Sequence, residues 1–428
     1  MELVIVTVLL VALVTSVPIA IALGLAAIAG IVYMSPEFLV LLPQKVMGGV
    51  DGFTLLAIPL FILAGSIMGH GGIAQRIVNM ALVVVGRVRG GLGLVVIIST
   101  MFFSGVCGSA SADTAAIGSV TLPEMIKRKY PPAFATALLA AAGGTATLIP
   151  PSIDLIIIGV VAGISIGGLF AAGFLPGLVN ALALMGLAYY YGRKLDLPLM
   201  DPTTWKEKVT IFADGIFALL MPVIILGGIL GGVFTPTEAS AVAVVYGLIV
   251  SFFVYRELKL SDLPVVLLDA CKLTGIVMLV LAMASALSFV LAFERIPHEI
   301  AQFIVEHAGN WVVFVIFVNI LFLLLGMIMD ALPALIILMP ILVPAGKALG
   351  MDPIHIGIFI EANVAISLIT PPVGVCLYVA CGLSKLPIEA VVKPLIPFLL
   401  VLVSTLLVIS YVPEITLFVP RLLGYVGP

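Results

Sequence analysis

Apolar segments of helical length follow one another along almost the whole chain, with only short polar stretches between them. A helix needs about 20 apolar residues to cross the hydrocarbon core of a bilayer. The segments lack the alternating pattern of a membrane β-barrel. Of the 428 residues, 63% are hydrophobic and only 10% are charged, which is too little charge to cover a water-soluble protein of this size. The sequence therefore predicts an all-α polytopic membrane protein.

The charge and the reactive residues exclude several functional classes. The formal net charge of −3 offers no basic surface for a nucleic acid. The four cysteines and four histidines lack metal-ligand spacing, and the sequence contains no nucleotide-binding P-loop and no protease or esterase motif. We therefore expect a protein that is not an enzyme and has no cofactor. Its surroundings are the lipid bilayer, and no nucleic acid is expected as a partner.

Several apolar segments are too short to cross the membrane alone, and these short segments come in pairs. Such pairs are typical of re-entrant hairpins and broken helices. Their irregular backbone is tolerated at membrane depth only where it is buried in protein or lines a cavity. We predict two hairpins, at about 91–126 and 311–346, and two broken helices, at about 133–167 and 353–384.

The two halves of the chain repeat one pattern of prolines. Pro132 lies 19 residues before Pro151, and Pro353 lies 19 residues before Pro372. Repeated, interrupted apolar segments are the best sequence sign of a secondary transporter's binding site. In an inverted repeat the two hairpins enter from opposite faces and their tips meet near the midplane. The predicted units are a first repeat, a polar linker and a second repeat, at residues 1–191, 192–210 and 211–428.

The start of the chain and its basic loops give an expected topology. Residues 3–33 have no positive n-region and are longer than a signal-peptide core, so we expect one long span that bends near Pro18. Lysine and arginine gather in four loops, near residues 87–89, 127–129, 193–208 and 256–259. The positive-inside rule predicts that these loops are cytoplasmic.

The tip of the first hairpin is polar although apolar segments surround it. Its glycines permit a sharp turn, and Ser109, Ser111, Asp113 and Thr114 provide oxygens or caps for a helix that begins there. A helix N-terminus carries partial positive charge and free N–H groups, which suit an anionic carboxylate. The alternative is a tight helix–helix contact made by small residues and hydroxyl groups.

A proline pair interrupts each broken helix. Pro150 and Pro151 remove two backbone donors and push the preceding residues out of the α region. The carbonyl groups of residues 144–148 therefore need other partners. A bound cation is one such partner, and water or a hydroxyl group is another. The second half repeats the arrangement with Asn363, Ser367, Thr370, Pro371, Pro372 and Gly374.

Acidic residues mark several of the interruptions. Asp330, at the second hairpin tip, lies in an apolar region and can either ligate a cation or cap the helix that starts near Pro333. Glu361 and Asp154 flank the broken helices and can pair or relay protons, whereas Glu238 is expected at a helix N-terminus. Neither tip contains lysine or arginine, so a carboxylate substrate needs helix ends, hydroxyl groups or co-bound cations. Sodium suits such oxygen cages better than a proton does.

Four stretches of the sequence together resemble one family. They are SGVCGSASADTAAIG at 104–118, GGTATLIPPSIDLIIIG at 143–159, TPTEASAVAVVYG at 235–247 and SLITPPVGVCLYVACGLS at 367–384. They resemble the large membrane subunit of tripartite ATP-independent periplasmic (TRAP) transporters, and the resemblance covers nearly the whole chain. It implies an inverted-repeat, elevator-type fold in the bacterial inner membrane. It also implies sodium-driven uptake of organic acids such as C4-dicarboxylates or sialic acids.

The resemblance further implies partners and site residues. The partners are a small four-helix membrane subunit, expected as a separate chain, and a periplasmic binding protein that delivers a small organic anion. The implied first sodium site contains Ser104, Ser109, Ser111, Asp113, Gly143, Gly144, Thr145 and Thr147. The implied second sodium site contains Met329, Asp330, Ala331, Asn363, Thr370 and Gly374. The implied substrate contacts between the hairpin tips are Ser109, Ala110, Pro150, Pro151, Ala331, Pro371 and Pro372.

Two other functions stay open on the sequence alone. One is a self-sufficient anion symporter or exchanger of the same superfamily, which would need no binding protein. The other is a membrane scaffold or channel, although sealed hairpins favour alternating access over a continuous pore. Transport by the chain alone in liposomes would support the first function, and channel-like conductance would support the second.

Overall fold

The computed structural model describes residues 2–15, 17–199, 204–327 and 331–427. Within these ranges the chain forms helices and turns and contains no strand. Before the polar linker the helices are α1 (Glu2–Val14), α2 (Ile19–Met34), η1 (Pro36–Leu41), α3 (Leu42–Gly48), η2 (Phe53–Leu56), α4 (Ala57–His70), α5 (Ile73–Val85), α6 (Gly91–Cys107), α7 (Ala110–Lys127), α8 (Pro132–Thr145), η3 (Ala146–Leu148), α9 (Ile153–Ala162) and α10 (Ile166–Lys194). After the linker they are α11 (Trp205–Leu230), α12 (Pro236–Ile249), η4 (Val250–Val254), α13 (Leu263–Phe293), α14 (Ile296–Ala308), α15 (Trp311–Gly326), α16 (Ala331–Ala348), α17 (Pro353–Ser367), α18 (Val375–Ser384), α19 (Ile388–Tyr411) and α20 (Pro413–Leu422).

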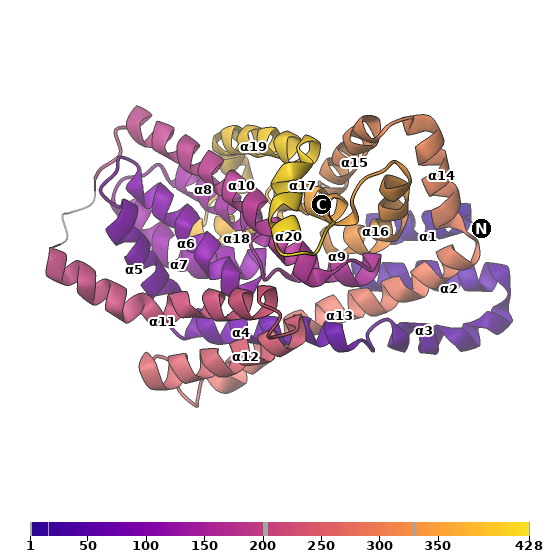
Figure 1. Ribbon diagram of the computed structural model, residues 1–428, viewed down its shortest axis with the longest axis horizontal. Helices are drawn as coiled ribbons and strands as arrows, with labels where there is room; N and C mark the ends of the chain where they lie inside the picture. The colour runs from indigo at the N-terminus through magenta and orange to yellow at the C-terminus, as the bar shows by residue number, and fades with distance from the viewer. Residues whose placement is uncertain (1, 16, 200–203, 328–330, 428) are drawn as a thin grey trace.

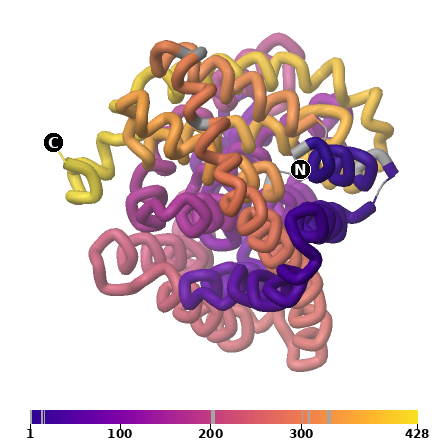
Figure 2. Tube along the Cα trace, turned by 90° about the vertical axis from the view of Figure 1, so that its right-hand side faces the viewer, coloured from indigo at the N-terminus to yellow at the C-terminus, as the bar shows by residue number. Residues whose placement is uncertain are grey.

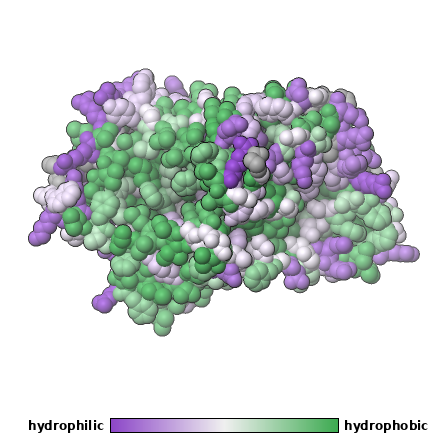
Figure 3. Space-filling model, in the orientation of Figure 1, coloured by the Kyte–Doolittle hydropathy of each residue, from purple (hydrophilic) through white to green (hydrophobic). Residues whose placement is uncertain are grey.

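The length and surface of the helices are those of a protein embedded in a bilayer. Among the described residues, seven helical stretches are long and apolar enough to cross a membrane. The stretch formed by α11 buries only 22% of its most apolar window, and side chains such as Phe212 and Val223 are exposed. Figure 3 shows hydrophobic residues over the middle of the molecule and hydrophilic residues gathered toward its two ends. The predicted all-α polytopic membrane fold is confirmed.

The helices form two layers (Figure 1). One layer contains α2, α3, α4, α11, α12 and α13, in which α4 packs against α12 and α13, and α13 packs against α2. The hairpins and broken helices form a thicker body on this layer, and the view turned by 90° shows the same division (Figure 2). The candidate site residues therefore lie mainly in one body, supported by long apolar helices.

The N-terminal apolar stretch is not the single bent span that the sequence predicts. α1 and α2 pack side by side instead, and a Cβ atom added to Gly30 would lie 3.1 Å from Cδ1 of Ile5. Pro18 explains the break, because proline cannot donate a backbone hydrogen bond to the preceding turn. Its carbonyl oxygen accepts from the N–H groups of Ile21 and Ala22, at 2.9 and 3.0 Å, and starts a new helix.

The predicted pairs of short helices are present. α6 with α7 forms the first hairpin, and α15 with α16 forms the second. α8 and α9 flank the three-residue helix η3 in the first broken helix, and α17 and α18 form the second. In both halves the order is hairpin, broken helix, and then one long helix, α10 or α19. This order agrees with an internal repeat, whose limits at 1–191 and 211–428 stay a prediction.

The loop before α6 and the linker lie at the same end of the molecule. Arg89, before α6, forms an ion pair of 2.9 Å with Asp196, after α10. Arg76 on α5 forms an ion pair of 2.6 Å with Glu257, after η4. The first contact joins the loop before α6 to the linker, on the left of Figure 1, and the second joins the start of α5 to the loop after η4. The predicted cytoplasmic location of the basic loops stays a prediction.

Helix α12 begins as its sequence predicts. The backbone N–H of Thr235 donates to Oε2 of Glu238 at 2.8 Å, and the Glu238 N–H donates to Oγ1 of Thr235 at 3.3 Å. Pro236 occupies the first turn, where its missing donor costs nothing. The reciprocal bonds form a capping box, so the predicted role of Glu238 at a helix N-terminus is confirmed.

Helices α8 and α17 cross at the centre of the body. Every residue of α17 from Ile354 to Ser367 is buried. A Cβ atom added to Gly144 on α8 would lie 2.6 Å from the carbonyl oxygen of Ala365 on α17. Only a glycine lets the two backbones approach this closely. Helices α8 and α17, which begin the two broken helices, are therefore in direct contact, and they come from different halves of the chain.

Candidate functional site

The tip of the first hairpin docks on the break of the first broken helix. α6 ends at Cys107, and Gly108 turns the chain with a positive φ of 67°. The carbonyl oxygen of Gly108 accepts from the Ile153 N–H at 3.1 Å. A Cβ atom added to Gly108 would lie 2.6 Å from the Pro151 carbonyl oxygen. Both the turn and the close approach thus require glycine here.

Ser104, Asp113 and Ala146 meet at this break. The Ser104 hydroxyl donates to the Ala146 carbonyl oxygen at 2.7 Å. The Asp113 carboxylate lies beside Ser104 and Cys107, is completely buried, and accepts no hydrogen bond at either oxygen. Because the only proton of Ser104 goes to Ala146, its hydroxyl presents lone pairs to the carboxylate. Two adjacent oxygens without a shared proton suit a cation.

Two of the carbonyl groups that the sequence leaves free, those of Gly144 and Ala146, already have partners. The Ala146 carbonyl oxygen accepts from Ser104 and also from the Ile149 N–H, at 2.9 Å. Thr147 donates to the Gly144 carbonyl oxygen at 3.2 Å, and Thr145 donates to the Ala142 carbonyl oxygen at 2.9 Å. Hydroxyl groups therefore satisfy part of the broken backbone, which is one of the two alternatives that the sequence leaves open.

The remaining residues of the implied first sodium site have other surroundings. Gly143 packs against Thr114 of α7, and Gly144 packs against α17, so both serve close helix packing. The hydroxyl groups of Ser109 and Ser111 lie 3.4 Å apart and are partly buried. Ser109 lines a cavity of about 380 Å³ between α4, α6, α7 and α13. Ser109 therefore faces open space, whereas Asp113 is completely buried.

The second break offers a different oxygen. Nδ2 of Asn363 donates both its hydrogens, to Oδ1 of Asn319 at 2.8 Å and to the Phe359 carbonyl oxygen at 2.9 Å. Because a carbonyl group can only accept, this bond to Phe359 fixes the orientation of the amide. Oδ1 of Asn363 is left buried without a hydrogen-bond partner. The bond to Phe359 thus explains why Oδ1 is the atom left without a donor, while the role of Asn363 as a sodium ligand stays a prediction.

A buried polar network that the sequence motifs do not predict holds Asn363. Nδ2 of Asn319 donates to the Ser410 hydroxyl at 3.3 Å. Nε2 of His355 donates to the Ser410 carbonyl oxygen at 3.2 Å, and its Nδ1 lies 2.7 Å from the Thr416 hydroxyl. The network joins α15, α17, α19 and α20. A signal was present in the sequence, because Asn319 is the only polar side chain in WVVFVIFVNILFLLLG.

The rest of the implied second sodium site is described only in part. Met329 and Asp330 lie outside the described residues. Ala331 is described only as the residue at which α16 begins. Oγ1 of Thr370 donates to the Ile366 carbonyl oxygen at 2.7 Å, and the Gly374 N–H donates to the Thr370 carbonyl oxygen at 3.0 Å. Both residues therefore close the turn between α17 and α18.

Each hairpin lies against the break of its own half, where the proline pairs among the implied substrate residues are found. The tip with Ser109 and Ala110 adjoins the first proline pair, and Gly326 of the second hairpin packs against Ser367 of the second break. Both Pro150–Pro151 and Pro371–Pro372 are cis. The first pair is buried, whereas Pro372 is exposed. The second break is thus the more accessible of the two.

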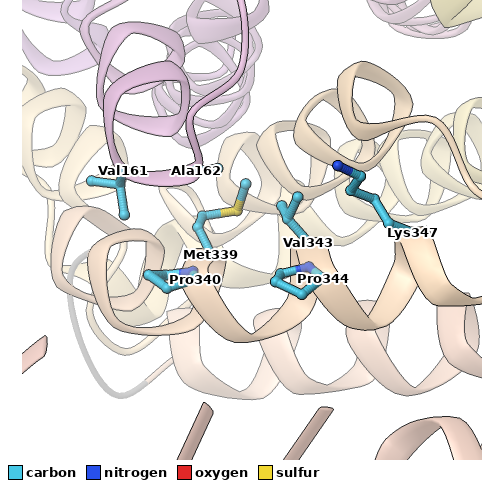
Figure 4. Close-up of a pocket in the computed structure, with 7 residues that line it drawn as sticks. All are labelled: Val161, Ala162, Met339, Pro340, Val343, Pro344 and Lys347. Carbon is cyan, nitrogen blue, oxygen red and sulfur yellow. The ribbon is translucent and has the colours of Figure 1, made fainter. Parts of the chain in front are cut away.

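A further cavity lies between α9 and α16 (Figure 4). It has a volume of about 490 Å³ and is lined by Val161, Ala162, Met339, Pro340, Val343, Pro344 and Lys347. Its lining is apolar except at Lys347, which stands at one end of the row of side chains on α16. Such a lining offers no group of oxygen ligands, so this cavity differs in chemistry from the two breaks.

Known proteins match almost the whole chain. Residues 6–415 match the family model of the tripartite ATP-independent periplasmic transporter, DctM component. The C4-dicarboxylate TRAP transporter large permease protein DctM of Pseudomonas aeruginosa is 39% identical over 403 residues, which are 94% of this chain and 94% of that protein. The isethionate TRAP transporter permease protein DctMQ of Oleidesulfovibrio alaskensis is 40% identical over 415 residues, which are 95% of this chain and 64% of that protein.

A solved structure is similar in fold. The YdaH transporter of Alcanivorax borkumensis matches with a TM-score of 0.59, covering 92% of this chain and 90% of that chain. The two sequences are 15% identical. At this identity the likeness concerns the helical membrane fold alone.

Proposed function

The chain belongs to the DctM family of tripartite ATP-independent periplasmic (TRAP) transporters, and on this basis we propose that it imports small organic acid anions together with sodium. The family places it among the large permease proteins, which are multi-pass proteins of the bacterial inner membrane and not enzymes. The proposal adds the coupling ion, the substrate class and the site residues to this family assignment.

The observation that carries sodium coupling is the buried oxygen left unpartnered at each break. Asp113 presents a carboxylate at the first break, and Asn363 presents Oδ1 at the second. A buried polar group without a partner costs free energy. Carboxylate, amide and hydroxyl oxygens are the ligands that hard cations prefer. A sodium ion at each break would satisfy both groups.

The substrate proposal follows from the relatives and from the hairpin tips. The matching permeases are named for C4-dicarboxylate and for isethionate, both small organic anions. At the first tip, α7 begins at Ala110 beside Ser109, and a helix N-terminus attracts anions. We propose a C4-dicarboxylate, a sialic acid or a similar carboxylate as the substrate. Sodium bound nearby would add the positive charge that the tip lacks.

The mechanism that we propose is an elevator movement of two inverted repeats. The hairpins and broken helices form one body, and the layer with α4, α11, α12 and α13 supports it (Figure 1). Movement of that body as a unit would carry both breaks and the anion across the bilayer without exposing free backbone groups to lipid. A small four-helix membrane subunit and a periplasmic binding protein would complete the transporter.

Sodium replacement tests this function. Reconstituted in proteoliposomes with its small subunit and binding protein, the chain should accumulate a labelled dicarboxylate or sialic acid only under an inward sodium gradient. Equal uptake when potassium replaces sodium would contradict the coupling. Omission of the binding protein serves as the second arm, because unchanged uptake without it would favour a self-sufficient symporter.

Asn319→Leu should weaken sodium coupling without touching a proposed ligand. The substitution removes the acceptor that holds the Asn363 amide, so Oδ1 of Asn363 would no longer be fixed toward the break. Loss of a residue that orients a metal ligand typically costs about 10–100-fold in affinity. The half-saturating sodium concentration for uptake should rise within that range, while Asn319→Asp, which keeps an acceptor, should retain more of the wild-type affinity. An unchanged sodium response in Asn319→Leu would contradict the orienting role.

A further inference from the structure

One face of α17 points into the first broken helix. Gly357, Glu361 and Ala365 are spaced by four residues and therefore share a helix face. A Cβ atom added to Gly357 would lie 3.1 Å from Cγ2 of Ile158 on α9. The Ala365 carbonyl oxygen lies against Gly144 on α8. Glu361, midway between these two contacts, must therefore point toward the break between α8 and α9.

The Glu361 carboxylate lies near η3 and α9, which both pack against α17. It lies beside the Thr147 hydroxyl of η3 and faces the Asp154 carboxyl group in the first turn of α9. Thr147 uses its proton for the Gly144 carbonyl oxygen, so it offers lone pairs to Glu361. The side chain of Glu361 is completely buried, and neither of its oxygens accepts a hydrogen bond.

This arrangement leaves the buried Glu361 carboxylate without a hydrogen-bond donor. Two carboxyl groups that face each other in a medium of low polarity repel strongly when both are ionised. A buried charge persists in proteins only when it is paired or coordinates a metal ion. The start of α9 contributes the partial positive charge of a helix N-terminus near Asp154, but Glu361 lies on another helix and needs a partner of its own.

We propose that Glu361, Asp154 and Thr147 form a cation site at the first break, distinct from the site at Ser104 and Asp113. The proposal rests on the proposed sodium coupling, since sodium is the cation that it places there. The two sites would lie on opposite sides of η3. Ala146 presents its carbonyl oxygen to Ser104 of the first hairpin, whereas the next residue, Thr147, presents its hydroxyl to α17.

The position of this site gives it a role in coupling. Glu361 belongs to the second half of the chain, and Thr147 and Asp154 belong to the first. A cation between them would join α17, the first helix of the second broken helix, to the break in the first broken helix. Sodium binding on one side of η3 would then favour binding on the other side, because both sites order the same three residues. Uptake should accordingly depend on sodium with positive cooperativity.

Glu361→Gln tests the site in the full transporter. Uptake is measured against sodium concentration in proteoliposomes that contain the small subunit and the binding protein, with potassium keeping the ionic strength constant. We expect the half-saturating sodium concentration to rise by about tenfold or more and the sodium Hill coefficient to fall. Glu361→Asp keeps the charge, so its half-saturating sodium concentration should lie between those of the wild type and Glu361→Gln. Glu389→Gln, an exposed carboxylate in the first turn of α19, is the matched control and should behave as the wild type.

The outcomes separate this site from the proposed function. A wild-type protein without sodium dependence would overturn the proposed function itself. A sodium-dependent wild type with an unchanged sodium curve in Glu361→Gln would overturn only the site formed by Glu361, Asp154 and Thr147. A variant that alters the pH profile of uptake but not its sodium dependence would show that Glu361 carries a proton, which also contradicts the cation.

A binding measurement keeps the test valid if Glu361→Gln folds poorly. Sodium should raise the unfolding temperature of the purified chain, because a ligand that binds only the folded state stabilises it. Asp154→Asn and Glu361→Asp should reduce this sodium-induced shift relative to Glu389→Gln. Equal shifts in all of these proteins would contradict the site.

Discussion

Asp113→Asn should abolish sodium-coupled uptake while leaving the protein folded. The asparagine keeps the size of the side chain but removes the charge that faces the Ser104 hydroxyl at the first break. Loss of groups that merely orient a metal ligand costs about 10–100-fold in affinity, so loss of a ligating carboxylate should raise the half-saturating sodium concentration by at least about 100-fold. The measurement is uptake against sodium concentration in proteoliposomes.

Folding stability distinguishes this effect from simple damage. A buried carboxylate without a partner carries a desolvation cost. In sodium-free buffer Asp113→Asn should therefore unfold at the same temperature as the wild type or at a higher one. Added sodium should stabilise the wild type and have a smaller effect on the variant. Glu124→Gln is the control on the same helix, since Glu124 pairs with Arg128 at 2.6 Å.

A sodium response in Asp113→Asn equal to that of the wild type would contradict the assignment of Asp113 as a ligand. A lower unfolding temperature in sodium-free buffer would indicate that the carboxylate stabilises the fold. In that case the loss of uptake would have a structural cause, and the first break would have to bind its cation through other oxygens.

The interruptions of the helices could be predicted from the sequence because proline and glycine act locally. The pairs Pro150–Pro151 and Pro371–Pro372 each remove two consecutive backbone donors, whereas α10 continues through its single proline, Pro176. Helices α8 and α17 end within a few residues of these pairs. At Pro18 the missing backbone donor is compatible either with a bent helix or with a reversal of the chain direction between α1 and α2. The contact between Ile5 and Gly30 selects the reversal, and a contact between helices cannot be found from spacing alone.

The site residues follow the same distinction. Asp113 and Asn363 stand out as polar residues beside predicted breaks, and the structure shows that each has an unpartnered oxygen. The direction of Glu361 depends on how α17 lies across α8 and α9, so the sequence could offer it only as a flanking acid. Asn319 holds the Asn363 amide, and Ser410 and His355 support Asn319 through contacts between distant helices. No local pattern predicts such contacts. Asp330 stays a prediction.

Gly144→Val should prevent α8 and α17 from crossing. A Cβ atom at this position would lie 2.6 Å from the Ala365 carbonyl oxygen, which belongs to the backbone and cannot rotate away as a side chain can. Overpacking in a close-packed interior typically costs about 1–3 kcal/mol. The shift should also move Thr147 relative to Glu361. We expect a lower unfolding temperature and a loss of uptake larger than the loss of folded protein.

Gly186→Val provides the control for the change of residue type. Gly186 lies within α10, and a Cβ atom added there meets no atom within 4 Å. Its substitution should leave unfolding temperature and uptake near wild type, because valine is a better helix former than glycine and nothing has to move. If Gly144→Val behaved like Gly186→Val, the two helices could separate without cost, and a cation held between them could not couple the halves of the chain.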